Sequence, residues 1–110
     1  KLEKKGDPSF TEGIGQSRIT KNLENCIVDM SYHINDKECL EILYKLIKTE
    51  GLFLGTSSGV NIMGAIKMAK ELGSGKTIVT ILCDDANKYY DKMFNKKFLE
   101  TKNLPIPDWI

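Results

Sequence analysis

The stretch Gly51-Leu52-Phe53-Leu54-Gly55-Thr56-Ser57-Ser58-Gly59 is a short apolar segment that ends in a turn of small residues. The turn leads directly into residues 60–72, where apolar residues recur at helical spacing. A strand, a turn of small residues and a helix N-terminus together bring backbone N–H groups within reach of a ligand. The stretch therefore predicts a ligand-binding turn, with Ser58 as the N-cap of the helix that follows.

The residues before this turn predict a strand followed by a helix. Residues 28–34 alternate between apolar and polar side chains, which is typical of a half-buried strand. Asn35 and Glu38 have the spacing of a capping box, and an apolar stripe at helical spacing follows them. Gly51 supplies the expected end of this helix, because glycine adopts the left-handed conformation at little cost.

The residues after the turn predict a third strand and two short helices. Residues 77–83 form a continuous run rich in Thr, Ile and Val, which suits a central parallel strand covered on both faces. Helices are expected at residues 87–94 and 97–101, before a tail that contains two prolines. The order of elements predicts an α/β fold made of parallel-sheet βαβ units with right-handed crossovers.

The composition excludes several classes of function. With 110 residues the chain forms one domain at most, and its net charge of +1 gives no support for binding to nucleic acid or to a membrane surface. No apolar run approaches the length of a membrane span. Cys26, Cys39 and Cys83 are odd in number and lack C-x-x-C spacing, so we expect reduced thiols of a cytoplasmic protein and no metal site.

Two familiar motifs are present only in part. Gly55 to Gly59 matches the G-x-S-x-G elbow of serine hydrolases, but the only histidine, His33, precedes the serine and is expected at the surface. The segment 73–77 resembles the end of a P-loop, but Lys70 stands where the first glycine is required, and a helix rather than a strand comes before it. Both interpretations are therefore rejected. Residues 10–20, with two glycines, are interpreted either as a packed loop or as a loop that lies against a ligand.

Three segments in order, residues 11–20, 50–59 and 75–84, resemble the C-terminal third of the cysteine synthase (O-acetylserine sulfhydrylase) family. The tail at residues 94–99 and 104–109 resembles the end of the same proteins. These are fold-type-II pyridoxal-phosphate enzymes, a group that includes cystathionine β-synthase. The resemblance implies that residues 1–110 are a single α/β segment, an incomplete C-terminal part of a larger two-domain enzyme.

The resemblance also implies roles for particular residues. Ser57 matches the serine that hydrogen-bonds the pyridine nitrogen of pyridoxal 5'-phosphate, and Cys83 and Asp84 match the strand end that flanks this nitrogen. Gly13, Ile14 and Gly15 match the loop beside the substrate amine, and Gly13 is also expected to contact the cofactor. The Schiff-base lysine and the phosphate-binding loop of the family match nothing in this chain. No catalytic residue is therefore assigned, and we expect the segment alone to be inactive.

The implied reaction is the formation of L-cysteine from O-acetylserine and sulfide by β-elimination and β-replacement. Alternatives within the class are a cystathionine β-synthase and a cysteine desulfhydrase. An alternative from another class is a non-catalytic α/β module that mediates dimer or partner contacts. The resemblance further implies a homodimer with an amino-acid substrate and sulfide, and some relatives bind serine acetyltransferase.

Overall fold

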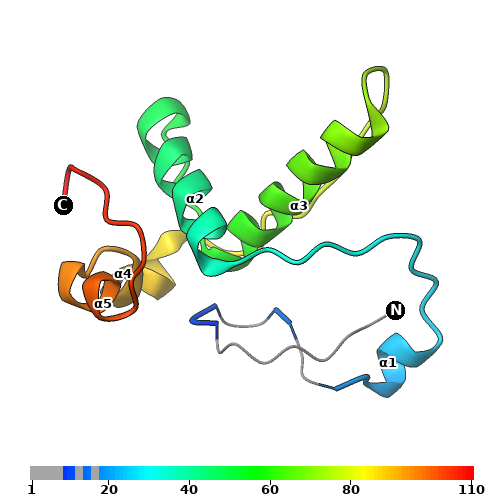
Figure 1. Cartoon of the computed structure of the whole chain (residues 1–110), viewed down its shortest axis with the longest axis horizontal. Helices are drawn as coiled ribbons and strands as arrows, with labels where there is room; N and C mark the ends of the chain where they lie inside the picture. Colours follow the sequence, from blue (N-terminus) through cyan, green and yellow to red (C-terminus); the bar gives the residue numbers. More distant parts are fainter. Residues whose placement is uncertain (1–8, 12–13, 16–17) are drawn as a thin grey trace.

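The computed structural model describes residues 9–11, 14–15 and 18–110, and these residues fold as helices joined by extended segments (Figure 1). The two long helices are α2 (Asp36–Glu50) and α3 (Thr56–Leu72). The short elements are α1 (Lys21–Glu24), the 3-10 helix η1 (Ala86–Tyr89), α4 (Tyr90–Met93) and α5 (Lys96–Thr101). A membrane-spanning helix is not found in this described part of the chain.

Helix α2 begins and ends where the sequence predicts. The Asn35 side chain accepts a hydrogen bond from the Glu38 N–H at 2.9 Å, and the Asn35 N–H donates to the Glu38 carboxylate at 3.1 Å. These two bonds satisfy backbone and side-chain groups reciprocally at the helix N-terminus. Gly51 ends the helix in the left-handed conformation, with φ 66°. Both predicted signals of this helix are confirmed.

The predicted parallel sheet is wrong. The described residues contain no strand, and their one β-bridge is isolated and antiparallel, between Leu54 and Asp85. Residues 28–34 and 77–83 are extended but unpaired, and the side chain of Val79 is 86% exposed. An apolar run favours an extended backbone, but a strand also needs a neighbouring backbone to pair with its N–H and C=O groups. None of the described segments supplies that neighbour.

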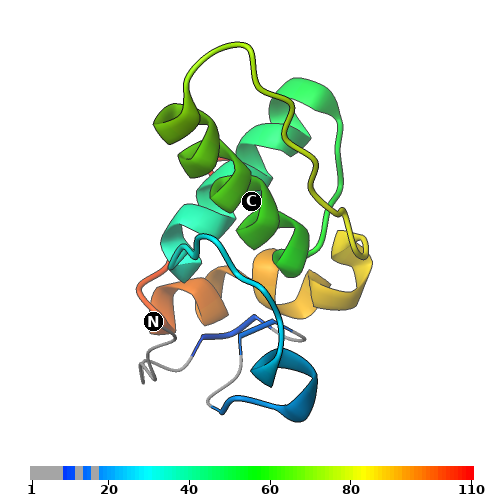
Figure 2. The same ribbon diagram turned by 90° about the vertical axis from the view of Figure 1, so that its right-hand side faces the viewer.

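The segment after α3 instead runs along this helix, and the segment before α2 passes below it in the view of Figure 1. Figure 2 shows the same chain turned by 90°. Before α2, the Lys67 ammonium donates to the His33 carbonyl oxygen at 3.3 Å. After α3, the Asn61 amide donates to the Ile81 carbonyl oxygen at 3.0 Å. Side chains of α3 therefore bond backbone carbonyl oxygens of both segments. His33 itself is exposed, as its position on the polar face predicted.

Helix α3 begins earlier than predicted. Its N-cap is Gly55, which is extended at φ −76° and ψ 171°, so Thr56, Ser57 and Ser58 all lie in the first turn of the helix. The prediction of Ser58 as the N-cap is wrong, because its hydroxyl bonds another segment instead of its own helix. The predicted helix at residues 87–94 is split into η1 and α4, and α5 confirms the helix expected near residues 97–101.

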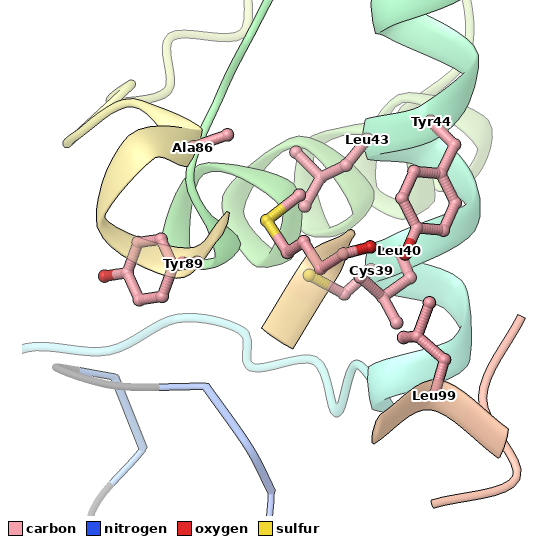
Figure 3. Packing of buried hydrophobic residues seen from close by; sticks show 8 residues of the cluster. Cys39, Leu40, Leu43, Tyr44, Ala86, Tyr89 and Leu99 are labelled. Carbon is pink, nitrogen blue, oxygen red and sulfur yellow. Dashed lines mark hydrogen bonds between the residues drawn. The ribbon is translucent and has the colours of Figure 1, made fainter. Parts of the chain in front are cut away.

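The core lies where one end of α2 meets the short helices (Figure 3). Each of its eight hydrophobic residues is no more than 6% exposed, and they come from α2, η1, α4 and α5. The residues are Cys39, Leu40, Leu43, Tyr44, Ala86, Tyr89, Met93 and Leu99. This core holds the start of α3 and the segment around Asp85 together, and so it positions the turn at Gly55.

Candidate functional site

The turn at Gly55 is pressed against the segment that precedes η1. The Gly55 N–H donates to the Asp84 carbonyl oxygen at 2.9 Å, and the Ala86 N–H donates to the Phe53 carbonyl oxygen at 3.2 Å. A Cβ atom on Gly55 would overlap with the Asp84 carboxylate and would lie 3.0 Å from the Asp85 carbonyl oxygen. Glycine is required here because two backbone segments approach more closely than a side chain allows.

The three hydroxyl groups at the start of α3 differ in what they contact. Ser58 is fully buried, and its Oγ accepts a hydrogen bond from the Cys83 N–H at 2.9 Å. Thr56 is also fully buried, and its Oγ1 has no hydrogen-bond partner among the described residues. Ser57 is 7% exposed, and its hydroxyl makes no hydrogen bond within the part of the chain that is described. Of the two hydroxyl groups of this turn without a partner among the described residues, that of Ser57 is on the less buried residue.

Cys83 and Asp84 lie beside this turn, on the segment that ends at η1. The hydrogen bond from Cys83 to Ser58 and the one from Gly55 to Asp84 fall on either side of Ser57 along the chain. The Cys83 side chain is exposed and free of any disulfide. The structure thus brings together three of the residues that the sequence assigned to a cofactor site.

The Asp84 carboxylate lies between the turn and η1, because its Oδ1 is the atom that a Cβ on Gly55 would overlap. Its Oδ2 accepts a hydrogen bond from the Tyr89 hydroxyl at 2.9 Å and lies 3.8 Å from the Lys88 ammonium. Its Oδ1 is buried and has no partner among the described residues. Burial raises the pKa of Tyr89, the hydrogen bond to Asp84 raises that pKa further, and the Thr56 hydroxyl beside the phenol opposes the rise.

Two residues of this cluster, Thr56 and Tyr89, were missed by sequence reasoning. Thr56 belongs to the quoted turn but follows no helix-capping or metal-binding pattern. Tyr89 lies far from the turn in the sequence, at the end of η1, and it carries no local motif. Only the fold reveals that its ring lies against Gly55 and that its hydroxyl bonds Asp84.

The predicted substrate loop is described only in part. Gly13 lies outside the described residues. Ile14 is half-buried and Gly15 is exposed with φ 75°, and among the described residues neither makes a hydrogen bond to the turn. The preceding residue Phe10 is tied elsewhere, because its N–H donates to the Asp36 carboxylate at the start of α2, at 3.1 Å. The assignment of Gly13, Ile14 and Gly15 stays a prediction.

A metal centre finds no support in the described part of the chain, which holds no group of three or more His, Cys, Asp and Glu side chains that could bind an ion. The arrangement offers one neutral hydroxyl at a helix N-terminus and one carboxylate held beside it. A hydroxyl of this kind can donate to or accept from a heterocyclic nitrogen. The site therefore fits the nitrogen edge of a planar cofactor.

The sequence of the chain is similar to those of several known proteins. The chain is 47% identical over 106 residues to "Cysteine synthase 1" of Neurospora crassa, and the match covers 94% of this chain and 28% of that protein. It is 38% identical over 107 residues to "Cysteine synthase" of Dictyostelium discoideum, covering 97% of this chain and 28% of that protein. It is 37% identical over 98 residues to "Cystathionine beta-synthase" of Dictyostelium discoideum, covering 89% of this chain and 20% of that protein.

The chain thus spans about 28% of the length of the cysteine synthases that it matches. Residues 1–84 match the family described as "Pyridoxal-phosphate dependent enzyme". The matched residues include the whole of the turn and extend to Asp84. The chain belongs to the family of pyridoxal-phosphate dependent enzymes.

Proposed function

We propose that this chain is part of a pyridoxal-phosphate dependent cysteine synthase that makes L-cysteine from O-acetylserine and sulfide by β-elimination and β-replacement. The observation that carries the proposal is Ser57, whose hydroxyl is uncommitted among the described residues, while the neighbouring hydroxyl of Ser58 is already bonded to the Cys83 N–H. Similarity to cysteine synthases over most of the chain supports the choice of reaction.

Ser57 would hold the pyridine nitrogen of the cofactor. When bound, pyridoxal phosphate supplies an electron sink for the bond that is broken at the substrate. A neutral hydroxyl binds the ring nitrogen without keeping it protonated, whereas a carboxylate partner favours the protonated form. Ser57 thereby favours elimination and replacement at the β-carbon. Cys83 and Asp84 would flank the same nitrogen, and the hydrogen bond from Cys83 to Ser58 keeps that segment in place.

The remaining roles are extended from the resemblance. Gly13, Ile14 and Gly15 would lie beside the substrate amine, and Gly13 beside the cofactor as well. The chemistry at the substrate α-carbon requires a Schiff-base lysine, and we assign that role to no lysine of this chain. The segment would act only when joined to the rest of the enzyme, which we expect to be a homodimer of the fold-type-II group in the cytoplasm. The three free thiols fit a reducing compartment. Serine acetyltransferase is the partner to test, by co-purification with the full-length protein.

A cystathionine β-synthase is the second candidate, because one such enzyme is 37% identical to this chain over 98 residues. A hydroxyl at Ser57 suits both reactions, so the two candidates are distinguished by which substrates the enzyme converts faster. The full-length protein, supplied with the cofactor, should convert O-acetylserine and sulfide to cysteine faster than it converts serine and homocysteine to cystathionine. The reverse order would favour the second candidate.

The experiment that tests the proposal compares Ser57→Ala with Ser31→Ala in the full-length protein. Ser31 is exposed on the extended segment before α2 and serves as the control. The substitution at Ser57 should lower the rate of cysteine formation with an unchanged unfolding midpoint, and the control should change neither quantity. A full-length protein that binds no pyridoxal phosphate, judged by its visible absorption, would refute the proposal. Equal rates of cysteine formation in the two variants would show that Ser57 is not part of the site.

A further inference from the structure

A pocket of about 400 Å³, open to solvent, lies between the end of α2 and the tail that follows α5. Four residues line this pocket: Ile47 and Lys48 of α2, and Asp108 and Trp109 of the tail. In Figure 1 the tail, drawn in red, rises from α5 on the left of α2. The volume lies within the range of about 300–1,000 Å³ that is usual for small-molecule sites. None of the four residues belongs to the turn at Gly55, so the function proposed above gives the pocket no role.

Backbone and aromatic contacts hold the tail side of the pocket in place. The Ile110 N–H donates to the Pro107 carbonyl oxygen at 3.3 Å. This bond closes a turn whose two central residues are Asp108 and Trp109. The Trp109 ring packs edge-on against the ring of Tyr44, which is 6% exposed, with the ring centroids 5.9 Å apart. Trp109 itself is 42% exposed, so part of its ring remains free to contact a ligand.

The two charged residues of the pocket have opposite signs and do not neutralise each other. Neither Lys48 nor Asp108 forms an ion pair within the part of the chain that the structure describes. The remaining lining is the apolar side chain of Ile47 and the aromatic ring of Trp109. A ligand that complements this lining therefore carries one positive group, one negative group and an apolar side chain.

We propose that this pocket binds an α-amino acid with an apolar side chain, in its zwitterionic form. The Lys48 ammonium binds the carboxylate of the ligand, the Asp108 carboxylate binds its ammonium, and the apolar side chain lies against Ile47 and Trp109. A simple anion or cation satisfies only one of the two charged residues. Both of these residues are exposed, so each charge contributes little and the binding depends on their combination. The inference is independent of the cofactor and of the proposed reaction.

The test measures binding to the full-length protein by isothermal titration calorimetry. The probes are L-phenylalanine, 3-phenylpropionate, which lacks the ammonium, and 2-phenylethylamine, which lacks the carboxylate. L-Phenylalanine should bind more tightly than either analogue. Lys48→Gln and Asp108→Asn should each weaken its binding about two- to fivefold, as expected for the loss of one exposed charge contact. Asp108→Asn should also bind L-phenylalanine and 3-phenylpropionate equally, because the partner of the ammonium is gone.

Lys45→Gln on α2 and Asp91→Asn on α4 are the matched controls, since both side chains are exposed and lie outside the pocket lining. They should leave the affinity for L-phenylalanine unchanged. The inference is overturned if L-phenylalanine does not bind, or if 3-phenylpropionate binds the unsubstituted protein as tightly. It is also overturned if all four variants bind L-phenylalanine like the unsubstituted protein, because the ligand then lies elsewhere, such as at the cofactor.

Discussion

Gly59 and Gly64 lie five residues apart on α3, and replacing each by alanine should shift stability in opposite directions. A Cβ atom on Gly59 would lie 2.7 Å from Cys39 Sγ and 2.8 Å from Leu43 Cγ, across the contact between α2 and α3. A Cβ atom on Gly64 would meet nothing within 4 Å among the described residues. Both substitutions gain about 0.5–1 kcal/mol from the better helix propensity of alanine.

The two variants differ only in the packing at the new methyl group. Overfilling a close contact costs about 1–3 kcal/mol, because Cys39 and Leu43 are buried and cannot move aside freely. Gly64→Ala should therefore stabilise the protein by about 0.5–1 kcal/mol. Gly59→Ala should be destabilising relative to Gly64→Ala by about 1–3 kcal/mol, since the propensity gain cancels in the difference.

Urea unfolding, monitored by circular dichroism, measures the unfolding free energy of both variants. If this free energy falls with urea concentration at the same slope in both, their midpoints can be compared directly. The packing between α2 and α3 is refuted if the two variants unfold at the same midpoint. It is also refuted if Gly59→Ala is the more stable of the two. Either result would mean that the first turn of α3 does not lie against Cys39 and Leu43.

Three further predictions concern the elements around the site. Asn35→Ala removes the side-chain acceptor of the Glu38 N–H, while the backbone N–H of residue 35 can still donate to the Glu38 carboxylate. The substitution should cost about 1 kcal/mol of unfolding free energy, as read from thermal unfolding, and no loss would contradict the cap. Ser58→Ala removes the hydrogen bond from the Cys83 N–H and should cost about 1 kcal/mol of unfolding free energy. The Cys83 amide should then exchange its hydrogen faster with solvent, and an unchanged exchange rate would show that this amide does not bond Ser58. Burial raises the pKa of Cys39 from 9.0 to about 12, so the folded protein holds this proton more tightly than the unfolded chain. The contribution of this thiol to stability is complete below pH 9.0 and should be lost as the pH rises toward about 12. The unfolding free energy is measured against pH in the unsubstituted protein and in Cys39→Ala. An equally large alkaline loss in the variant would show that Cys39 is not its cause.

Helix α2 could be predicted from sequence because its determinants are local. Asn35, Glu38 and Gly51 act through bonds and backbone angles within a few residues, and the apolar stripe between them gives the buried face. The start of α3 was placed three residues late because Gly55 offers no capping side chain, whereas Ser58 has the expected chemistry. The serine is used for a contact with Cys83 that no local rule reveals.

The sheet was predicted wrongly because pairing is not a local property. Residues 77–83 have the composition of a buried strand, yet Val79 and Ile81 are 86% and 70% exposed. Composition reports that a segment suits an extended conformation, and the partner that would complete a sheet has to come from elsewhere in the structure. The α3 side chains of Asn61 and Ser58 bond this segment instead.

The candidate site could be predicted only in part, because some of its contacts depend on segments that are far apart in the sequence. Ser57, Cys83 and Asp84 were identified through the resemblance, and the structure brings them to one turn, although their roles in binding stay predictions. Tyr89 could not be found in this way, because its contact with Asp84 depends on how η1 packs beneath Gly55.

The most direct test of the central claim is the ¹⁵N resonance of ring-labelled pyridoxal phosphate bound to the full-length protein, compared between the unsubstituted protein and Ser57→Ala. If the Ser57 hydroxyl bonds the ring nitrogen, its removal should shift this resonance, while Ser31→Ala should leave it unchanged. A resonance that is the same in all three proteins would contradict the claim that the turn at Gly55 holds the nitrogen edge of the cofactor.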